Sequence, residues 1–409
     1  MRKKVLFVIN TMGRGGAEFS LIQFMRQFDP EQFDLYLYVM LGQGELIDRI
    51  PSYVTLLNDD YDSSDVLSEK GKRILYRRTA KMLLCSGAFI KGIPTMLGNI
   101  AHLRNKVRQH PEKVIWRMVA NSAPVFRENF DLAVAYLEGA STYFLSDRVK
   151  AKQKIAFFHT DYMRSGYTPK LDGKAYANMD KIYCVSEEGR ASFLQAYEQY
   201  RGKTEVFYNI IDRDSIMRRA NMPCSFDDDG YNGIRIVTLG RLIKLKAIDK
   251  SIRTMRRLKE QGINARWYVY GEGSERVFLE REIQLYGLQD CFFLPGVADN
   301  PFPYLLKADI YVQCSEYEGR SLAISEAQLL GRPVIISNHS GNVGQVRNLV
   351  DGMLVEFTSK DIARAIIQLV ENPELRSFLG KNAAEKMKHE CDHHTFGRIL
   401  QLMEGGKSA

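Results

Sequence analysis

The chain lacks any long hydrophobic run, although 45% of its 409 residues are hydrophobic. No stretch approaches the ~20 consecutive apolar residues that a membrane-spanning helix requires. The amino-terminal segment Met1–Asn10 is basic and then apolar, but it is short and glycines follow it. We therefore expect neither a transmembrane helix nor a signal peptide. The length suits two domains, since a domain typically contains ~100 to 200 residues.

The chain also has few cysteines, and they follow no pattern. Its six cysteines have neither the paired spacing of a disulfide framework nor the spacing of metal ligands. The adjacent His393 and His394 have no third ligand nearby in the sequence, and neighbouring helical residues point about 100° apart. We therefore expect reduced thiols, no bound metal and a cytoplasmic location.

Short β-branched or aromatic runs alternate with helical stretches, which is typical of βα units on a parallel sheet. The alternation occurs twice, so the sequence predicts an α/β chain with two parallel sheets. The predicted strands of the first series are Val5–Asn10, Phe33–Met40, Asp131–Leu137, Lys154–Phe158, Lys181–Val185 and Glu205–Tyr208, and those of the second are Ile236–Leu239, Arg266–Tyr270, Cys291–Leu294, Asp309–Gln313 and Pro333–Ile336.

Two carboxylates eight residues apart follow one of these predicted strands. Glu318 lies in the loop after Asp309–Gln313, and Glu326 lies in a predicted helix that runs from Ser321 to Leu330. In an open parallel sheet, ligands bind outside the carboxyl ends of the strands, so both acids can reach one small molecule there. Two fixed carboxylates suit a ligand that is rich in hydroxyl groups.

Two basic residues follow another strand of the same series. Arg241 and Lys246 come after Ile236–Leu239 and therefore lie at the same sheet edge as Glu318. A guanidinium binds phosphate bidentately and a lysine binds it as a compact charge, so together they can hold a diphosphate. A single charged loop residue is usually just solvated, but the joint placement favours a nucleotide sugar as the ligand.

These residues resemble the retaining glycosyltransferases of the GT-B fold, in the group with a Glu-x7-Glu signature (family 4-like, glycosyl transferases group 1). The resemblance covers nearly the whole chain. Its further motifs are Gly15-Gly16-Ala17-Glu18, Phe158-His159-Thr160-Asp161-Tyr162, Tyr208-Asn209-Ile210-Ile211-Asp212, Gly240-Arg241-Leu242, Tyr270-Gly271-Glu272-Gly273 and Gly331-Arg332-Pro333-Val334-Ile335.

The resemblance implies two Rossmann-like domains that face each other across a cleft. The acceptor-side domain would cover residues 1–210, with a helical insert at about 66–120. The nucleotide-sugar domain would cover residues 211–390, and residues 391–409 would cross back to the first domain. The resemblance also implies that Glu318, Arg241, Lys246 and His159 are catalytic, and that the donor is bound by Gly15, Gly16, Glu326, Gly319, Arg320, Ser321, Leu322, Gly271 and Gly273.

Local alternatives remain for several of these residues. Gly15 and Gly16 either approach the donor or serve tight packing, and a dinucleotide site is disfavoured because Glu18 replaces the third glycine of G-x-G-x-x-G. His159 follows a strand end, where it contacts the transferred sugar or the acceptor, or is structural. Gly271 and Gly273 shape either a nucleotide-side loop or a plain turn.

The chemistry that the resemblance implies is transfer of a sugar, with retention, from a uridine-linked donor to a hydroxyl of a glycan, polymer or lipid-linked acceptor. Arg241 and Lys246 would stabilise the departing diphosphate, so neither a metal nor a cofactor is expected. The family is usually given a front-face mechanism, and a double displacement through Glu318 is less favoured. Arg320-Ser321 replaces the common Phe-Gly, and Gln345 stands where an acid is common, so we assign no chemistry to the stretch 340–346.

A basic segment between residues 70 and 118 accounts for much of the net charge of +8. Its apolar residues interleave with the charges, which indicates either helices on an anionic membrane or a hairpin packed on the first domain. Nucleic acid is disfavoured, because no stacking platform of spaced aromatics is present. The basic residues are Lys70, Lys72, Arg73, Arg77, Arg78, Lys81, Lys91, Arg104, Lys106, Arg108, Lys113 and Arg117.

Two other functions stay open. One is another GT-B enzyme, either an epimerase that converts the donor without an acceptor or a phosphorylase with a lysine-bound pyridoxal cofactor. The other is a catalytically silent subunit that binds nucleotide sugar or membrane for a partner transferase. The presence of Arg241, Lys246, Glu318 and Glu326 argues against a silent subunit.

Overall fold

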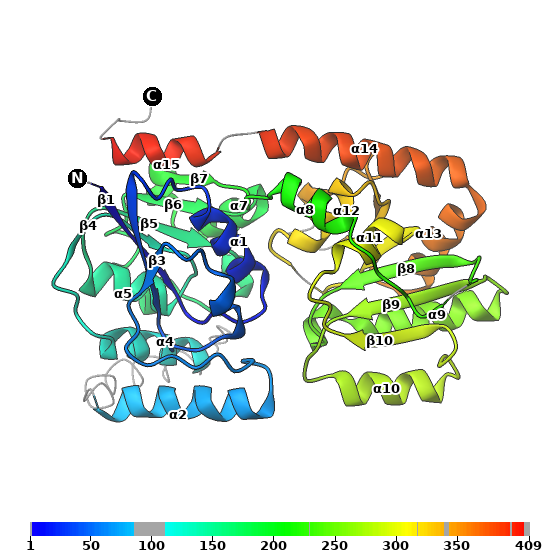
Figure 1. Ribbon diagram of the computed structural model, residues 1–409, viewed down its shortest axis with the longest axis horizontal. Helices are drawn as coiled ribbons and strands as arrows, with labels where there is room; N and C mark the ends of the chain where they lie inside the picture. Colours follow the sequence, from blue (N-terminus) through cyan, green and yellow to red (C-terminus); the bar gives the residue numbers. More distant parts are fainter. Residues whose placement is uncertain are drawn as a thin grey trace. The chain divides into compact units, whose positions relative to one another are not determined.

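The chain forms two compact units in its structure, a computed structural model. Unit 1 comprises Met1–Ile210 and His394–Ala409, and unit 2 comprises Ile211–His393 (Figure 1). The structure describes residues 2–85, 111–228, 230–316, 318–338, 343–392 and 395–404. The pair His393 and His394, and the basic residues Lys91, Arg104, Lys106 and Arg108, lie outside the described residues.

Unit 1 is built on a parallel sheet of seven strands in the order β3-β2-β1-β4-β5-β6-β7. The order reverses between β1 and β4, which pair in parallel, so the loops after these two strands flank the switch point where such sheets bind ligands. The strands are β1 (Lys3–Ile9), β2 (Phe33–Val39), β3 (Val54–Leu56), β4 (Asn129–Ala135), β5 (Lys150–Phe158), β6 (Lys181–Cys184) and β7 (Thr204–Val206).

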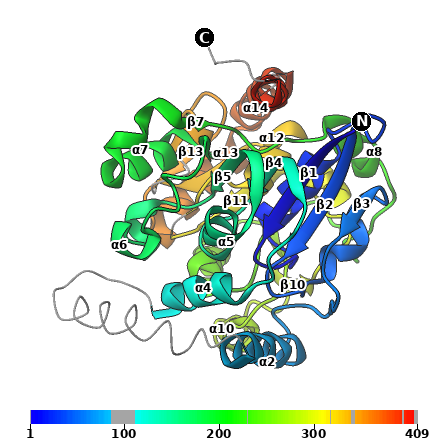
Figure 2. The same cartoon turned by 90° about the vertical axis from the view of Figure 1, so that its left-hand side faces the viewer.

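Helices cover both faces of the unit 1 sheet. Alternate side chains of β1 enter two different cores, as the period of two in a strand requires, with Phe7 in one and Leu6 in the other. Figure 2 shows α4 and α5 beside the sheet on the Leu6 side. The helices are α1 (Gly16–Met25), α2 (Glu69–Cys85), α4 (Pro111–Ser122), α5 (Ala140–Arg148), α6 (Pro169–Asp172), α7 (Glu187–Ala196) and α15 (Thr395–Met403), with 3-10 turns η1 (Glu45–Arg49), η2 (Tyr162–Arg164) and η3 (Glu198–Lys203).

The carboxyl-terminal helix α15 belongs to the core of unit 1. Its Ile399 is fully buried, and the ring of Phe396 lies 4.8 Å from that of Phe28 and 6.0 Å from that of Phe24. Phe24 belongs to helix α1, and Phe28 follows its end. The first 210 residues therefore complete their core with a segment from the far end of the chain.

Unit 2 repeats the design with a parallel sheet of six strands in the order β10-β9-β8-β11-β12-β13, so its switch point lies between β8 and β11. The strands are β8 (Ile234–Leu239), β9 (Ala265–Tyr270), β10 (Phe292–Gly296), β11 (Ile310–Gln313), β12 (Val334–Ser337) and β13 (Met353–Val355). The helices are α8 (Arg213–Ala220), α9 (Ile248–Glu260), α10 (Arg276–Leu285), α11 (Phe302–Lys307), α12 (Leu322–Leu329), α13 (Ser359–Glu371) and α14 (Pro373–Asp392), with 3-10 turns η4 (Lys244–Lys246) and η5 (Val343–Gln345).

The two parallel sheets confirm the predicted α/β class. All eleven predicted strands are present, and their ends lie within two residues of the predicted ones, except that β5 begins four residues earlier. The sequence analysis missed β3 and β13, because three residues at a sheet edge are too few to show an alternating pattern. No helix within the described residues is long and apolar enough to span a bilayer.

Phe24 lies at the centre of the aromatic core of unit 1. It is fully buried, and its ring lies 5.5 to 6.0 Å from six others, among them Phe7, Tyr136 and Phe207. We expect Phe24→Ala to destabilise unit 1 by about 3–5 kcal/mol, because it leaves a cavity that the rings cannot fill. Hydrogen exchange of peptides from β1 and β4 measures this loss. Phe19→Ala, on the exposed side of the same helix, is the control and should cost far less; equal losses would contradict the central role.

Candidate functional site

The loops after β8 and β9 lie against each other in unit 2. The Leu242 amide donates to the Glu272 carbonyl at 2.9 Å, and the Gly240 amide to the Tyr270 carbonyl at 3.1 Å. A Cβ atom on Gly271 would overlap the carbonyl oxygen of Gly240, and one on Gly273 that of Leu242. Close backbone packing therefore explains both glycines, and their part in donor binding stays a prediction.

Lys246 and Glu318 form an ion pair, although 72 residues separate them. Lys246 is the last residue of η4, and Glu318 lies in the loop after β11, so the pair spans the switch point of the sheet. Their side chains are only 16% and 14% exposed. The Glu318 carboxylate also accepts hydrogen bonds from Ser315 Oγ at 2.7 Å and Gln313 Nε2 at 3.1 Å. It is therefore held in one position.

Arg241 precedes Lys246 by five residues in the loop after β8 and is exposed. Its guanidinium has no hydrogen-bond or ion-pair partner within the part of the chain that the structure describes. A cation in this state keeps all five of its N–H donors for a ligand. The sheet edge thus offers one positioned ammonium group and one solvent-facing guanidinium.

Glu326 lies on α12, and burial raises the pKa of its carboxyl to about 7, although the positive charge of Arg219 opposes this shift. Both Glu326 and Glu318 are close to the buried Tyr311. Burial, and then the two carboxylate charges, raise the pKa of the Tyr311 hydroxyl well above its ordinary value. The two acids of the signature therefore act on the same small region of unit 2.

Arg320 and Ser321 connect Glu318 to α12, and both are engaged within the protein. The Arg320 guanidinium is paired with Glu390 of α14, and its side chain is only 8% exposed. Ser321 precedes Leu322, the first residue of α12, but its hydroxyl does not cap the helix; it bonds to Gln313 at 3.2 Å. Gly319, between Glu318 and Arg320, is partly buried.

Gln345 is a site-forming residue that the sequence analysis left without a function. It is buried, and its side-chain amide bonds to the backbone of Ser321 on both sides: it accepts from the Ser321 amide at 2.7 Å and donates to the Ser321 carbonyl at 2.9 Å. The Ser321 amide is thus unavailable to a ligand while this pairing lasts. Gln313 and Ser315 were missed as well, since nothing in their local pattern marks them as partners of a carboxylate.

In unit 1, Gly15 and Gly16 begin α1 directly after the switch-point strand β1. Gly15 is the N-cap residue, and its amide donates to the Gly13 carbonyl at 2.9 Å. A Cβ atom on Gly15 would meet the carboxylate of Glu18, which is the mobile end of a long side chain. An acidic side chain therefore lies beside the start of α1, and the part of Gly15 and Gly16 in donor binding stays a prediction.

His159 lies at the end of β5, and its Nε2 atom is buried without a hydrogen-bond partner among the described residues. Burial lowers the pKa of the imidazole, and the negative charge of Glu138 and a hydrogen bond to the Tyr136 backbone oppose this shift. A neutral imidazole with an unpaired nitrogen can bond to a ligand hydroxyl. Asp161 caps η2 by accepting from the Met163 amide at 2.9 Å.

Glu138 is the residue that fixes the His159 loop, and the sequence analysis missed it. Its carboxylate is 6% exposed and accepts the His159 amide at 3.1 Å and the Thr160 hydroxyl at 2.9 Å. The side chain of Asn10, at the end of β1, donates to the Glu138 carbonyl at 3.2 Å. These contacts join the loops after β1, β4 and β5.

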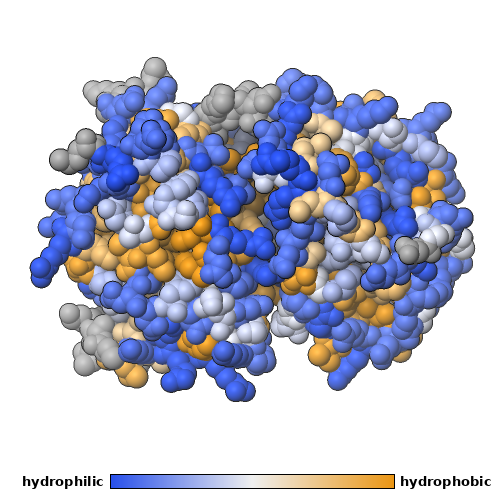
Figure 3. All heavy atoms as spheres, in the orientation of Figure 1, coloured by the Kyte–Doolittle hydropathy of each residue, from blue (hydrophilic) through white to orange (hydrophobic). Residues whose placement is uncertain are grey.

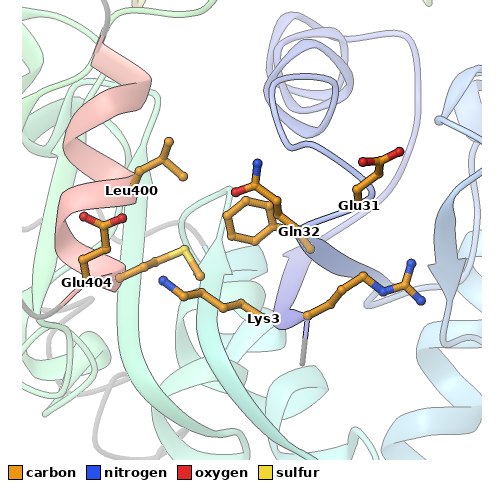
Figure 4. A pocket seen from close by; sticks show the side chains of 8 residues that line it. Lys3, Glu31, Gln32, Leu400 and Glu404 are labelled. Atoms are coloured by element: carbon orange, nitrogen blue, oxygen red, sulfur yellow. The ribbon is translucent and has the colours of Figure 1, made fainter.

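A separate pocket of unit 1 lies at the opposite sheet edge. Figure 4 shows its lining side chains, which include Lys3, Glu31 and Gln32 near the amino ends of β1 and β2, Leu400 of α15, and Glu404 directly after that helix. Its volume is about 320 Å³. Because the predicted site residues all follow carboxyl ends of strands, this pocket is not part of the candidate site. No cluster of potential metal ligands occurs within the described residues.

The comparison with known families and structures defines the class of this fold. Residues 231–386, which lie in unit 2, match the family model for glycosyl transferases group 1. The solved structure of Anabaena Alr3699/HepE in complex with UDP and glucose is similar, with a TM-score of 0.69 at 16% identity, over 99% of this chain and 100% of that one. The chain has the GT-B fold, and its region 231–386 is similar to the glycosyl transferases group 1.

Two curated relatives extend this similarity. Poly(ribitol-phosphate) alpha-N-acetylglucosaminyltransferase of Staphylococcus aureus is 25% identical over 284 residues, which are 64% of this chain and 56% of the relative. N-acetylgalactosamine-N,N'-diacetylbacillosaminyl-diphospho-undecaprenol 4-alpha-N-acetylgalactosaminyltransferase of Campylobacter jejuni is 25% identical over 215 residues, 52% of this chain and 57% of that protein. The chain therefore spans little more than half the length of either relative.

The raised pKa of Glu326 makes stability depend on pH. Below its ordinary pKa of 4.5 both folded and unfolded states are protonated, but from there up to about pH 7 only the unfolded chain ionises, so stability falls. We expect Glu326→Gln to remove this loss and to be the more stable protein at pH 8 by roughly 1–3 kcal/mol, with a smaller difference at pH 5. Calorimetric melting at both pH values measures it, with Glu371→Gln on an exposed surface as the control. An equal difference at both pH values would refute the assignment.

Proposed function

We propose that this protein is a retaining glycosyltransferase that moves a sugar from a UDP-sugar to a hydroxyl of a glycan, cell-surface polymer or lipid-linked acceptor. The observation that carries the proposal is the largely buried pair of Lys246 and Glu318, in the same set of loops as the exposed Arg241, at the switch point of unit 2. Cations for a diphosphate and a carboxylate for sugar hydroxyls thus occur side by side. The names of the relatives support a polymer or lipid-linked acceptor.

The cations are proposed to hold the donor diphosphate. Arg241 would bind phosphate oxygens bidentately, while Lys246 has three donors and can bond to Glu318 and to a phosphate at the same time. The first turn of α12, from Leu322 onward, adds backbone amides and the positive end of its helix dipole. Charge that develops on the leaving phosphate oxygen is then stabilised by groups that are already in place.

The carboxylates are proposed to hold the two sugars of the donor. Glu318 would accept hydrogen bonds from hydroxyls of the transferred sugar, with Gly319 giving close approach of the backbone. Glu326 would accept the two ribose hydroxyls, and such bonds favour the ionised form of a carboxyl whose pKa is about 7. Gly271 and Gly273 would allow the loop after β9 to border the nucleotide.

Unit 1 is proposed to contribute His159 and the start of α1. The unpaired, buried Nε2 atom of His159 would accept a hydrogen bond from a hydroxyl of the transferred sugar or the acceptor. Gly15 and Gly16 would bring the backbone at the start of α1 close to the donor, since neither residue has a side chain. We propose no direct ligand contact for the Arg320 side chain, because Glu390 already neutralises it.

Retention at the anomeric carbon is proposed to follow a front-face path. The names of both relatives specify an alpha linkage, and an alpha product from an alpha-linked donor is net retention. In this path the leaving phosphate oxygen takes the proton of the acceptor hydroxyl, so no covalent nucleophile is needed. Arg241 and Lys246 supply the positive charge for departure, so we propose that neither a metal ion nor a cofactor takes part.

Peripheral contact with an anionic membrane is proposed for the outer face of α2. Leu75 and Met82 turn inward against the core of unit 1, and Arg78 donates to the Gly42 carbonyl at 2.7 Å. The opposite side is exposed, and its single acidic residue is Glu69 in the first turn, which pairs with Lys72 at 3.0 Å. It also includes Arg73, Tyr76, Arg77, Ala80, Lys81 and Leu84, of which Tyr76 and Leu84 are each 74% exposed.

The spacing of these residues places them on one helical stripe, where basic heads and large apolar groups alternate. Figure 3 shows mostly hydrophilic side chains along the edge of unit 1 where α2 lies, interrupted by small hydrophobic areas. Such a stripe fits the anionic, partly apolar boundary of a lipid bilayer. Lys113 and Arg117 of α4 do not join it, since Lys113 lies over the Tyr167 ring and Arg117 pairs with Asp147. With this contact, we propose a cytoplasmic location at the inner membrane face.

A donor panel tests the proposed function. We expect one of the UDP, GDP and ADP sugars to bind, measured by calorimetry without added metal. Arg241→Ala should weaken UDP binding by roughly tenfold or more, since hydrogen bonds to a charged group are worth about 1.5–3 kcal/mol. Lys244→Ala, an exposed lysine of the same loop, is the matched control and should bind as the wild type does.

The same assays separate the alternatives. Glu318→Gln should keep UDP affinity and lose most of the transfer, because it keeps the shape but not the charge. Donor conversion without an acceptor would indicate an epimerase, a visible pyridoxal absorbance a phosphorylase, and donor binding without any turnover a silent subunit. Near-normal transfer by Glu318→Gln would remove Glu318 from its role.

Vesicle binding tests the membrane contact. We expect the triple variant Arg73→Glu, Arg77→Glu, Lys81→Glu to lose binding to phosphatidylglycerol vesicles by roughly a hundredfold or more, since each basic residue contributes about 1 kcal/mol near an anionic surface. The control is Lys360→Glu, Lys381→Glu, Lys388→Glu, three exposed lysines of unit 2. Sedimentation of both variants measures the effect, and unchanged binding of the α2 variant would end the proposal.

A further inference from the structure

Helix α14 contacts the segment between the two signature acids at two points. The first contact runs through Gln345, which is 1% exposed. Its side-chain amide pairs with the amide and carbonyl of Ser321 at 2.7 and 2.9 Å and also donates to Ser325 Oγ at 3.2 Å. The Gln345 side chain thus bonds to both backbone groups of Ser321, as a neighbouring strand does in a sheet. These two bonds fix the position of Ser321.

The backbone of Gln345 is itself held from α12 and from α14. Gln328 of α12 donates to its carbonyl at 3.1 Å, and Lys386 of α14 donates to the same oxygen. Lys386 also lies 3.6 Å from the carboxylate of Asp351, which is fully buried. The hydrogen bonds that hold Ser321 are therefore linked, through Gln345 and the ammonium group of Lys386, to α14.

The second contact is the ion pair of Arg320 with Glu390 of α14. Lys386 and Glu390 are four residues apart, so they lie on the same face of the helix. Arg320 and Ser321 are adjacent, and Glu318 precedes them by two residues. Two neighbouring positions of the segment are thus held by two neighbouring positions of α14.

Breaking either contact is unfavourable. Removing one partner of a buried ion pair leaves a charge without compensation, and removing a buried amide leaves backbone groups unsatisfied. The chemistry of Gln345 also explains why an amide is needed here: a carboxylate could accept from the Ser321 amide, but it could not donate to the Ser321 carbonyl. The segment therefore has one favoured backbone position.

We propose that α14 positions the segment that carries Glu318, and that Gln345, Arg320 and Glu390 are positioning residues for sugar transfer. This assignment rests on the proposed function, in which Glu318 orients the transferred sugar while Arg241 and Lys246 hold the diphosphate. Arg320-Ser321 replaces the common Phe-Gly next to Glu318, a position that suggests a donor contact for Arg320. The proposal gives Arg320 a structural contact instead. Arg320 is an anchor to α14 and does not recognise the donor.

The experiment uses two near-isosteric variants of the whole chain, Gln345→Glu and Glu390→Gln. We expect each to keep UDP affinity within about twofold and to lower kcat for transfer by roughly tenfold or more, because small displacements of a positioning group cost such factors. Lys388→Ala, an exposed residue of α14, is the matched control and should behave as the wild type does. The charge-reversed double variant Arg320→Glu, Glu390→Arg should recover most of the activity lost in Glu390→Gln.

Hydrogen exchange separates this inference from the proposed function. Peptides that cover residues 318–326 should exchange faster in Gln345→Glu and Glu390→Gln than in the wild type and Lys388→Ala, whether or not the protein transfers sugar. Wild-type exchange in both variants would overturn the inference even if the enzyme is active. A parallel loss of UDP affinity, kcat and melting temperature would also overturn it, since a merely structural role predicts that pattern.

Discussion

The largely buried pair of Lys246 and Glu318 is the interaction on which the candidate site depends. Neither charge is stable there alone, because a lone ion removed from water costs several kcal/mol, roughly, even after relaxation. The Ser315 hydroxyl and the Gln313 amide complete the hydrogen bonds of the carboxylate. The loops after β8 and β11 are thereby joined across the switch point.

The parallel sheet explains why such distant residues meet. Every strand of unit 2 ends at the same edge, and the reversal of strand order between β8 and β11 opens that edge. Unit 1 has the same geometry at β1 and β4, where the start of α1 and the Glu138 carboxylate lie. In each unit, a buried polar residue holds the loop of a candidate site residue: Gln345 holds Ser321, and Glu138 holds His159. The strands bring the site loops to one edge of the sheet, and single buried side chains then fix individual residues of those loops.

The sequence predicts the fold well because βα alternation is a local pattern, and eleven strands could be located from it. It also predicts that Arg241, Lys246, Glu318 and Glu326 share an edge, because strand ends do. It does not predict Gln345 or Glu138, since a buried amide or carboxylate is identified by its partners, which lie 24 and 21 residues away. Arg320 illustrates the same limit: its position beside Glu318 suggests a ligand contact, yet its partner is 70 residues further along the chain.

Helix α15 has a consequence for how the chain folds as it leaves the ribosome. Phe396 and Ile399 complete the core formed by α1 and β1, so the hydrophobic surface around Phe24 and Phe28 stays uncovered until residues 395–403 have been synthesised. Unit 2, by contrast, consists of one continuous stretch and can fold before the terminus emerges. Unit 1 is therefore synthesised first but completed last. Between these two times its aromatic rings are exposed, and exposed hydrophobic surface of this kind favours aggregation and chaperone binding.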